Sequence, residues 1–272
     1  MKNIEPINQI KLFGLDKYFK ELVILDNNNK LPNKIMLSGP KGQGKSTLAY
    51  HFINYILSKD DEFKYDISNF EINIENPTFK TTLNKSNPNL ISIDINDEKK
   101  FIDINQIREL IYNLKKTSFN KKPKFVLIDN IELLNINSIN ALLKILEEPS
   151  NNIFFILINN NKKILSTLLS RCINFRIFLS NKDSLAIADK LLGGNLSNSI
   201  NMNLINYYLS PGNIYNLVKF SYQNNYDLLN LDLMSFLKKI ISNNDYKKDS
   251  LIRHLIYDFL EFYLYRINSS FS

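Results

Sequence analysis

Residues 35–57, IMLSGPKGQGKSTLAYHFINYIL, decide how this chain folds. The apolar run at 35–37 predicts a buried strand, and the apolar residues after position 47 recur at the spacing of a helix face. Between them, residues 39–46 fit the pattern G-x-x-x-x-G-K-[ST] of the P-loop, whose backbone cradles phosphates. The stretch therefore predicts a strand, a phosphate-binding turn and a helix in succession.

Each part of this turn has a chemical task. Glycines let the backbone curl until its N–H groups converge on a phosphate, and the dipole of the following helix adds to the attraction. Lys45 is expected to reach the β- and γ-phosphates, and the Ser46 hydroxyl to be a Mg²⁺ ligand. A glycine-rich turn without a ligand is the alternative. We predict ATP and Mg²⁺ as cofactors, with nucleotide contacts from Gly39, Lys41, Gly42, Gln43, Gly44, Lys45, Ser46 and Thr47.

Composition sets the class of protein. The chain has 272 residues, enough for two domains or three small ones, and its 44% apolar and 22% charged residues are typical of a soluble globular protein. Its first residues have no apolar leader, and the longest purely apolar run is 153–158, so we expect neither secretion nor a membrane span. The single cysteine, Cys172, excludes an intrachain disulfide and a Cys₄ zinc site. A cytoplasmic protein is expected.

The net charge of +7 permits a nucleic-acid partner. The chain is also rich in Asn, Ile and Lys throughout, however, and this bias alone raises the number of lysines. Charge therefore does not decide between a nucleic-acid-binding protein and any other class.

Alternation of strands and helices predicts the fold. Apolar strands are expected at 90–95, 125–128, 153–158 and 173–177, and helices at 16–25, 105–115, 137–148 and 164–169, with a polar, irregular excursion at 58–89. Strands separated by helices form a parallel, doubly wound sheet, so the fold class is α/β.

After residue 178 the strands stop and the chain reads as helices, the last of them over 251–266. We predict three regions: a nucleotide-binding core over 1–178, a helical lid over 179–222, and a short helical C-terminal region over 223–272.

The strand predicted at 125–128 ends in Asp129, which fits a Walker B carboxylate orienting the water shell of Mg²⁺. A solvent-facing Asp at a strand end is the alternative.

The residue after Asp129 bears on hydrolysis. Many P-loop ATPases of the additional-strand class place Glu at this position, whereas here it is Asn130, whose amide cannot take a proton from water. Losing a general base costs about 10²–10⁴ in rate. Glu132, Glu147 and Glu148 are near in sequence, but spacing alone brings none of them to the site. ATP binding without efficient hydrolysis is therefore expected.

Residues 140–149, NALLKILEEP, followed by SRC at 170–172, resemble the NALLKxLEEP…SRC signature of bacterial clamp-loader ATPases of the AAA+ class. The resemblance extends over roughly residues 10–220. Within it, SPG at 210–212 is closer to the form found in delta-prime subunits of DNA polymerase III than to the G-S-x-R-D form of gamma/tau subunits.

The resemblance implies an AAA+ core with a helical lid, in a subunit that works with gamma/tau and delta subunits, a sliding clamp and primed DNA. It also implies that Arg171, which by spacing alone could be a surface residue, is an arginine finger acting in trans on a neighbour's ATP. The sensor 1 position falls at Asn159 or Asn160, and Asn159 is included among the predicted cofactor contacts.

Four departures from the family pattern bear on the kind of subunit. Asn130 replaces the catalytic acid of gamma/tau subunits, and no sensor 2 arginine follows Gly212. The four zinc-binding cysteines are missing, and the roughly 50 residues after the predicted lid are few for a helical collar. These departures favour a delta-prime-like subunit with weak or no hydrolysis of its own. The alternatives are a self-sufficient ATPase of the gamma/tau kind and a structural stator with a vestigial P-loop.

Overall fold

The computed structural model describes most of the chain, and it divides the chain into two compact units. One unit contains Asn3–Pro40 and Gly44–Phe178, and the other contains Met1–Lys2, Lys41–Gln43 and Leu179–Ser272. The described residues are 4–95, 101–115, 120–147, 152–205 and 209–248, together with Arg253, Ile256, Tyr257, Phe259, Leu260 and Leu264.

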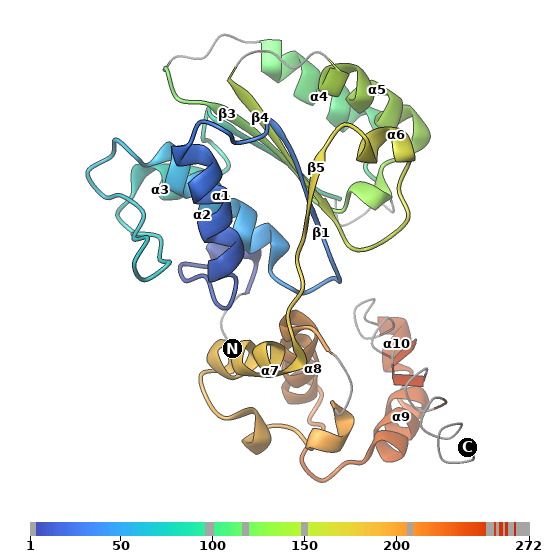
Figure 1. The fold of residues 1–272 in the computed structure, drawn as a ribbon. Helices are drawn as coiled ribbons and strands as arrows, with labels where there is room; N and C mark the ends of the chain where they lie inside the picture. The colour runs from blue at the N-terminus through green and yellow to red at the C-terminus, as the bar shows by residue number, and fades with distance from the viewer. Residues whose placement is uncertain are drawn as a thin grey trace. The chain divides into compact units, whose positions relative to one another are not determined.

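The unit that contains the P-loop helix is built on a five-stranded parallel sheet with the order β2-β3-β4-β1-β5 (Figure 1). Its central strands are apolar on both faces, as expected of a parallel sheet covered by helices on both sides. The parallel sheet confirms the predicted α/β class. The strands are β1 (Lys34–Ser38), β2 (Leu90–Ile93), β3 (Lys124–Ile128), β4 (Ile153–Asn159) and β5 (Ile173–Arg176).

Helices cover both faces of this sheet (Figure 1). The first three helices pack together on one side, and the next three pack together on the other. They are α1 (Asp16–Asn27), α2 (Lys45–Leu57), α3 (Pro77–Leu83), α4 (Ile104–Lys115), α5 (Ile136–Glu147) and α6 (Ser166–Leu169), with short 3₁₀ turns η1 (Pro6–Asn8) and η2 (Ile131–Leu133).

Two kinds of core hold these layers. On the α4–α5 side, aliphatic side chains of the sheet and helices form one cluster around Val126, Leu142 and Leu157, all fully buried. On the α1–α2 side, aromatic rings dominate: Phe19 is fully buried and its ring stacks on Tyr65 at a centroid distance of 4.9 Å. Truncating a buried Phe to Ala typically costs about 3–5 kcal/mol, so this aromatic core contributes strongly to stability.

The second unit consists of helices with one shared core. Fully buried residues such as Leu204, Val218 and Phe236 belong to a single hydrophobic cluster that runs from Ala188 to Phe259. Both the predicted lid and the predicted C-terminal region contribute to it, so their division at 222/223 stays a prediction. The elements are α7 (Asn181–Leu192), η3 (Leu196–Asn198), η4 (Met202–Leu204), α8 (Pro211–Gln223), α9 (Leu233–Ser242) and α10 (Asp245–Lys248).

One local prediction was wrong: residues 58–89 contain a helix, α3. The Asn76 side chain accepts a hydrogen bond from the Phe79 N–H over 2.9 Å, and Pro77 occupies the first helical turn, where its missing N–H costs nothing. Pro77, which we interpreted as a loop signal, therefore marks the start of a helix. Most of the helix predicted over 251–266 lies outside the described residues, as does Glu148 at the end of the predicted 137–148 helix.

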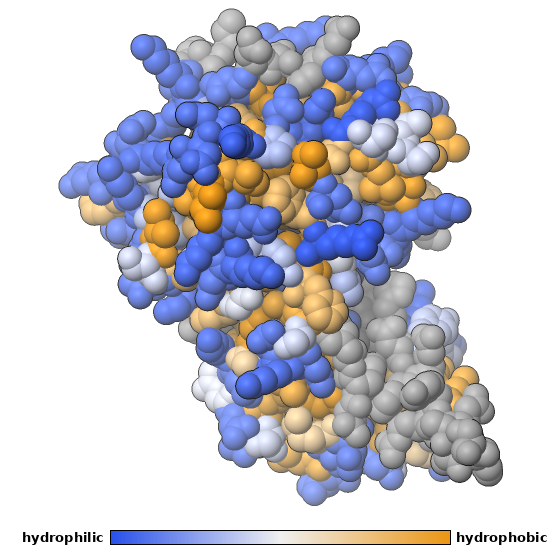
Figure 2. Space-filling view, viewed as in Figure 1, coloured by the Kyte–Doolittle hydropathy of each residue, from blue (hydrophilic) through white to orange (hydrophobic). Residues whose placement is uncertain are grey.

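On the face shown in Figure 2, exposed apolar side chains lie in several groups among hydrophilic ones. In the part of the chain that the structure describes, none of the helices combines the length and the apolar character needed to cross a bilayer.

Candidate nucleotide-binding site

The P-loop lies between β1 and α2, at the carboxyl end of a central strand. Gly44 stands immediately before α2 with φ +81°, a left-handed conformation that favours glycine, and a Cβ there would lie 3.1 Å from a Leu15 methyl carbon. Lys45 is only 3% exposed, and its Nζ donates to the carbonyl oxygens of Gly39 over 2.8 Å and of Pro40 over 2.7 Å. Its ammonium group is therefore held inside the curl of the loop, where a phosphate would bind.

The tip of the loop, Lys41–Gln43, belongs to the helical unit. Within that unit the Gly212 N–H donates to the Gly42 carbonyl over 3.0 Å, and a Cβ on Gly42 would lie 2.3 Å from the Ser210 hydroxyl oxygen. Position 42 thus requires glycine for packing as well as for its φ of +82°. Thr47, the last predicted contact of the loop, lies half-buried in the first turn of α2.

Ser46 and Asp129, the two predicted Mg²⁺ ligands, meet although they are 83 positions apart: the Ser46 hydroxyl donates to Asp129 Oδ2. Burial raises the pKa of Asp129, and the charge of Asp94 raises it further, against the opposing hydrogen bond from Ser46. Among the described residues no group of three or more His, Cys, Asp or Glu side chains can hold a metal. One hydroxyl and one carboxylate suit Mg²⁺ that takes its other oxygens from phosphates and water. The residues present therefore fit a nucleotide-bound Mg²⁺.

A network of amides and carboxylates joins the ends of β2, β3 and β4. Asn130 has a left-handed backbone with φ +54°, and its Nδ2 donates to Asp94 Oδ1 over 2.7 Å. Its Oδ1 accepts a hydrogen bond of 2.7 Å from Asn160 Nδ2, which also donates to Glu132 Oε1 over 2.9 Å. The residue that replaces the usual catalytic acid is thus bonded to a carboxylate from the neighbouring strand.

The two candidates for sensor 1 have different surroundings. Asn159 is buried, and its side chain bonds within a local turn, donating to the Lys162 carbonyl over 3.0 Å and accepting from the Lys162 N–H over 3.1 Å. Asn160 is bonded to the residue that follows Asp129. Sequence spacing could not separate these neighbours, because the two side chains point differently at the end of one strand.

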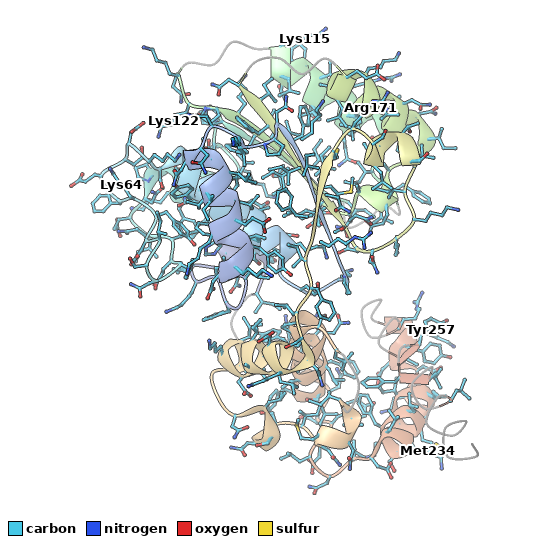
Figure 3. The ribbon with its side chains drawn as sticks, in the orientation of Figure 1. Lys64, Lys115, Lys122, Arg171, Met234 and Tyr257 are labelled. Atoms are coloured by element: carbon cyan, nitrogen blue, oxygen red, sulfur yellow. The ribbon has the colours of Figure 1, made fainter. Side chains whose placement is uncertain are left out.

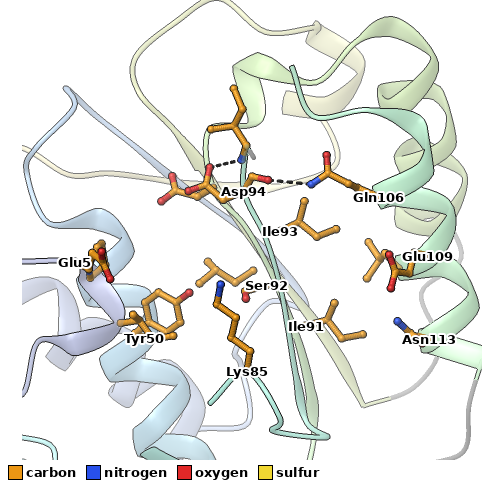
Figure 4. A pocket seen from close by; sticks show the side chains of 16 residues that line it. Glu5, Tyr50, Lys85, Ile91, Ser92, Ile93, Asp94, Gln106, Glu109 and Asn113 are labelled. Atoms are coloured by element: carbon orange, nitrogen blue, oxygen red, sulfur yellow. Dashed lines mark hydrogen bonds between the residues drawn. The ribbon is translucent and has the colours of Figure 1, made fainter. Parts of the chain in front are cut away.

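A pocket of about 450 Å³ opens beside Asp129, walled by β2, α2, α4 and η1 (Figure 4). Asp94 lies at its edge, where its carbonyl oxygen accepts a hydrogen bond of 3.0 Å from Gln106 Nε2. Sequence reasoning missed this pocket and Asp94. The available signal was an acidic residue directly after the strand at 90–93, the same pattern that identified Asp129. The ionisable side chains that line the pocket are those of Glu5, Tyr50, Lys85, Asp94, Glu109 and Asp129.

Arg171 lies by α5 and α6 (Figure 3). Its guanidinium bonds to the Glu147 carboxylate, with an Nη2–Oε1 distance of 2.5 Å, and donates to the Thr167 carbonyl over 2.7 Å. The Arg171 side chain is 31% exposed and that of Glu147 is 52% exposed. Exposed ion pairs of this kind contribute about 0–1 kcal/mol, so the arginine can be released at little cost.

The parallel sheet and the P-loop that joins β1 to α2 define a fold of the AAA+ class. In comparisons with known proteins, residues 14–180 match the family described as "DNA polymerase III, delta subunit". The match covers more than half of the chain, so the chain belongs to this family, which confirms the resemblance to clamp-loader proteins.

Individual relatives include both kinds of subunit. The chain is 34% identical over 173 residues to DNA polymerase III subunit gamma of Buchnera aphidicola subsp. Schizaphis graminum, a match covering 61% of this chain and 44% of the relative. It is 30% identical over 164 residues to subunit delta' of the same organism, covering 60% of this chain and 48% of that protein. The matched part thus spans less than half the length of these relatives, and it does not separate gamma from delta'.

Solved structures with a similar fold include the RuvB Holliday junction branch migration motor of Thermotoga maritima. It is 17% identical, with a TM-score of 0.45, and the match covers 89% of this chain and 81% of that one. A DNA polymerase III gamma subunit-related protein from the same organism is 16% identical, with a TM-score of 0.42, covering 80% and 66% of the two chains.

Proposed function

We propose that this chain is a delta-prime-like clamp-loader subunit of DNA polymerase III, which binds MgATP, hydrolyses it slowly at most, and supplies Arg171 to the ATP site of an adjacent subunit. The observation that carries the proposal is the contrast between an assembled Lys45–Ser46–Asp129 group and the amide of Asn130 beside it. The first can bind a magnesium-bound triphosphate, whereas the second cannot accept a proton from water.

The nucleotide contacts follow from this arrangement. The buried Lys45 ammonium would exchange its carbonyl acceptors for phosphate oxygens, and Ser46 with Asp129 would hold Mg²⁺ directly or through its water. Bound Mg²⁺ would offset the charge on the triphosphate. We assign the sensor 1 role to Asn160 in preference to Asn159, because the Asn160 side chain is bonded to Asn130 and the Asn159 side chain is engaged with Lys162.

The role of Arg171 rests on its place and on the exposure of its ion pair. Its partners are on α5 and α6, and the pair with Glu147 is exposed enough to be broken cheaply. An arginine delivered in trans stabilises the charge that develops on a transferring γ-phosphoryl group. The partners we propose are gamma/tau and delta subunits, with the sliding clamp and primed DNA engaged through the assembly, in the cytoplasm.

A second function is favoured by one observation, the 34% identity to a gamma subunit. In that alternative the chain is a self-sufficient ATPase, and primed DNA stimulates turnover by the chain alone. The third possibility, a stator with a vestigial P-loop, predicts no nucleotide binding.

The deciding experiment is copurification with gamma/tau and delta partners, followed by ATPase assays with and without clamp and primed DNA. We expect a stable complex in which Arg171→Ala lowers turnover and leaves this chain's own ATP affinity unchanged. Failure to join the complex, combined with DNA-stimulated turnover by the chain alone, would replace the proposal with the gamma/tau-like alternative.

A further inference from the structure

We propose that Asp94 is the carboxylate that accepts the proton of the attacking water in the slow ATP hydrolysis left to this chain. The inference rests on the proposed function, because it needs ATP at the P-loop. It adds a catalytic residue that directly follows β2, whereas Asp129 directly follows β3, and that lies 35 positions before Asp129 in the chain (129 − 94).

The orientation of Asn130 supports this assignment. An ionised carboxylate can only accept hydrogen bonds, so the group of Asn130 that lies 2.7 Å from Asp94 Oδ1 must be the NH₂. The other end of the amide then accepts from Asn160 Nδ2. The hydrogen bonds to Asp94 and from Asn160 therefore fix the Asn130 amide, and the fixed amide in turn holds the Asp94 carboxylate in place.

Asp94 is also the carboxylate that lies beside the proposed Mg²⁺ ligand. It lines the same 450 Å³ pocket as Asp129, its side chain is exposed, and its charge contributes to raising the pKa of Asp129 (Figure 4). Parallel pairing of β2 with β3 brings these two strand ends together, with Ile93 opposite Ile128. Water in the pocket can therefore reach both carboxylates.

Two of the rival carboxylates, Glu132 and Glu147, are engaged elsewhere. Glu132 accepts two hydrogen bonds from Asn160, one from Nδ2 and one of 3.3 Å from its backbone N–H, and it does not line the pocket. Glu147 is paired with Arg171. Glu109 also lines the pocket, from α4. The Asn130 amide, however, donates its hydrogen bond to Asp94, so Asp94 is the carboxylate that is held in place beside Asp129.

The proposed step balances in atoms and charge. The oxygen of a water molecule bonds to the γ-phosphorus as the bond from that phosphorus to the bridging oxygen breaks, and the electron pair leaves with ADP. One proton of the water moves to Asp94 Oδ2, because Oδ1 already accepts from Asn130 Nδ2 and from the Ile95 N–H over 2.7 Å.

The test compares full-length variants for ATP affinity and for phosphate release from MgATP under single-turnover conditions. We expect Asp94→Asn to reduce the rate by about 100-fold, within the range for loss of a general base, while ATP affinity changes less than about twofold. Glu109→Gln, which removes the same charge from the same pocket, is the matched control and should keep the wild-type rate. Lys45→Ala, whose ATP binding should be weaker by about 100-fold, provides the background rate at an ATP concentration below its own Kd.

The pH profile separates a base from a positioning residue. In the wild-type chain the rate should rise with pH through one ionisation, and Asp94→Asn should remove that limb while Asp94→Glu keeps it at a lower rate. Wild-type turnover by Asp94→Asn, a matching loss in Glu132→Gln, or wild-type hydrolysis no faster than the Lys45→Ala background would each overturn the inference. In all three cases normal ATP affinity would leave the proposed nucleotide site standing, whereas no ATP binding by the wild-type chain would remove both.

Discussion

The P-loop around Lys45 and the surface around Arg171 hold their cationic groups in opposite ways. Lys45 is 3% exposed and bonded to backbone carbonyls inside its own loop, whereas Arg171 has a side chain that is 31% exposed and is paired with an exposed glutamate. A buried cation that has already lost its water is ready to serve a ligand bound by the same chain. An exposed pair worth about 0–1 kcal/mol can open and present its arginine to another molecule. This difference supports the proposal that Lys45 serves ATP bound by this chain and that Arg171 acts on the ATP of a neighbouring subunit.

The largest expected effect is that of removing the exposed Arg171 guanidinium. Replacing Arg171 with Ala should lower hydrolysis at the adjacent subunit's site by about 10³-fold, because arginine fingers are worth about 10³–10⁵ in rate. The measurement is single-turnover ATP hydrolysis by the reconstituted assembly, with this chain's own ATP affinity determined in parallel. A loss of this chain's own ATP affinity would mean that Arg171, like Lys45, serves the ATP site of its own chain, which would contradict the proposed role in trans.

The role of the buried Lys45 ammonium group in ATP binding is tested by Lys45→Ala. Hydrogen bonds to a charged group contribute about 1.5–3 kcal/mol each, so losing the ammonium should weaken ATP binding by about 100-fold. Binding of ATP followed by calorimetry checks this, with the exposed Lys17→Ala on α1 as a control that should bind like wild type. Equal affinity in both variants would mean that the P-loop is vestigial, as in a stator.

Acid should destabilise the core around α2, the helix that follows the P-loop. Burial lowers the pKa of His51 to about 4, against an opposing hydrogen bond to the Gln9 carbonyl. That carbonyl can only accept, so Nε2 carries the proton and Nδ1 accepts from the Tyr65 hydroxyl over 2.9 Å. Between the unfolded pKa of about 6.5 and the folded value, the unfolded chain binds more protons, so stability falls as the pH is lowered.

The expected loss between pH 7 and pH 4.5 is about 2–3 kcal/mol from His51 alone. Urea unfolding at the two pH values measures it. The raised pKa of Asp129 acts in the opposite sense, because the folded chain takes up that proton at higher pH than the unfolded chain. The wild-type chain is therefore compared with His51→Gln. Between pH 7 and pH 4.5, the unfolding free energy of His51→Gln should fall by less than that of the wild-type chain. The same loss in both proteins would contradict a neutral buried His51.

The smallest effect concerns the partner of Arg171. Glu147→Gln removes the charge that holds the guanidinium, yet an exposed pair contributes about 0–1 kcal/mol, so unfolding free energy should change by less than about 1 kcal/mol. Hydrolysis by the reconstituted assembly should also change only slightly, because the variant frees an arginine that must in any case leave Glu147. A loss as large as that of Arg171→Ala would show that Glu147 positions the arginine while it acts.

Much of the fold could be predicted from local patterns. The apolar runs that became β1, β3 and β4 are buried on both faces, and their short length between turn residues predicted them as strands; the P-loop sequence predicted α2. The helix α3 was missed because a proline at a helix start and a proline in a loop look alike until the cap at Asn76 is visible.

The site was predictable only in part, because side-chain pairing between strands depends on their order in the sheet. Asp129 and Asp94 both follow a strand, a local signal that the sequence carries, but the proximity of Asp94 to Asp129 required knowing that β2 lies beside β3. The choice between Asn159 and Asn160 depended on which side chain turns toward Asn130, and the Glu147 partner of Arg171 depended on the packing of α5 against α6. Each of these facts is non-local and cannot be read from spacing.

The proposed division of roles, in which this chain holds ATP while Arg171 acts on a neighbour, can be tested by measuring ATP affinity and ATP turnover on the same sample of the chain alone. We expect saturable binding of MgATP that depends on Lys45, with turnover far below that of the reconstituted assembly. Brisk turnover by the isolated chain that is abolished by Asn130→Ala would contradict it.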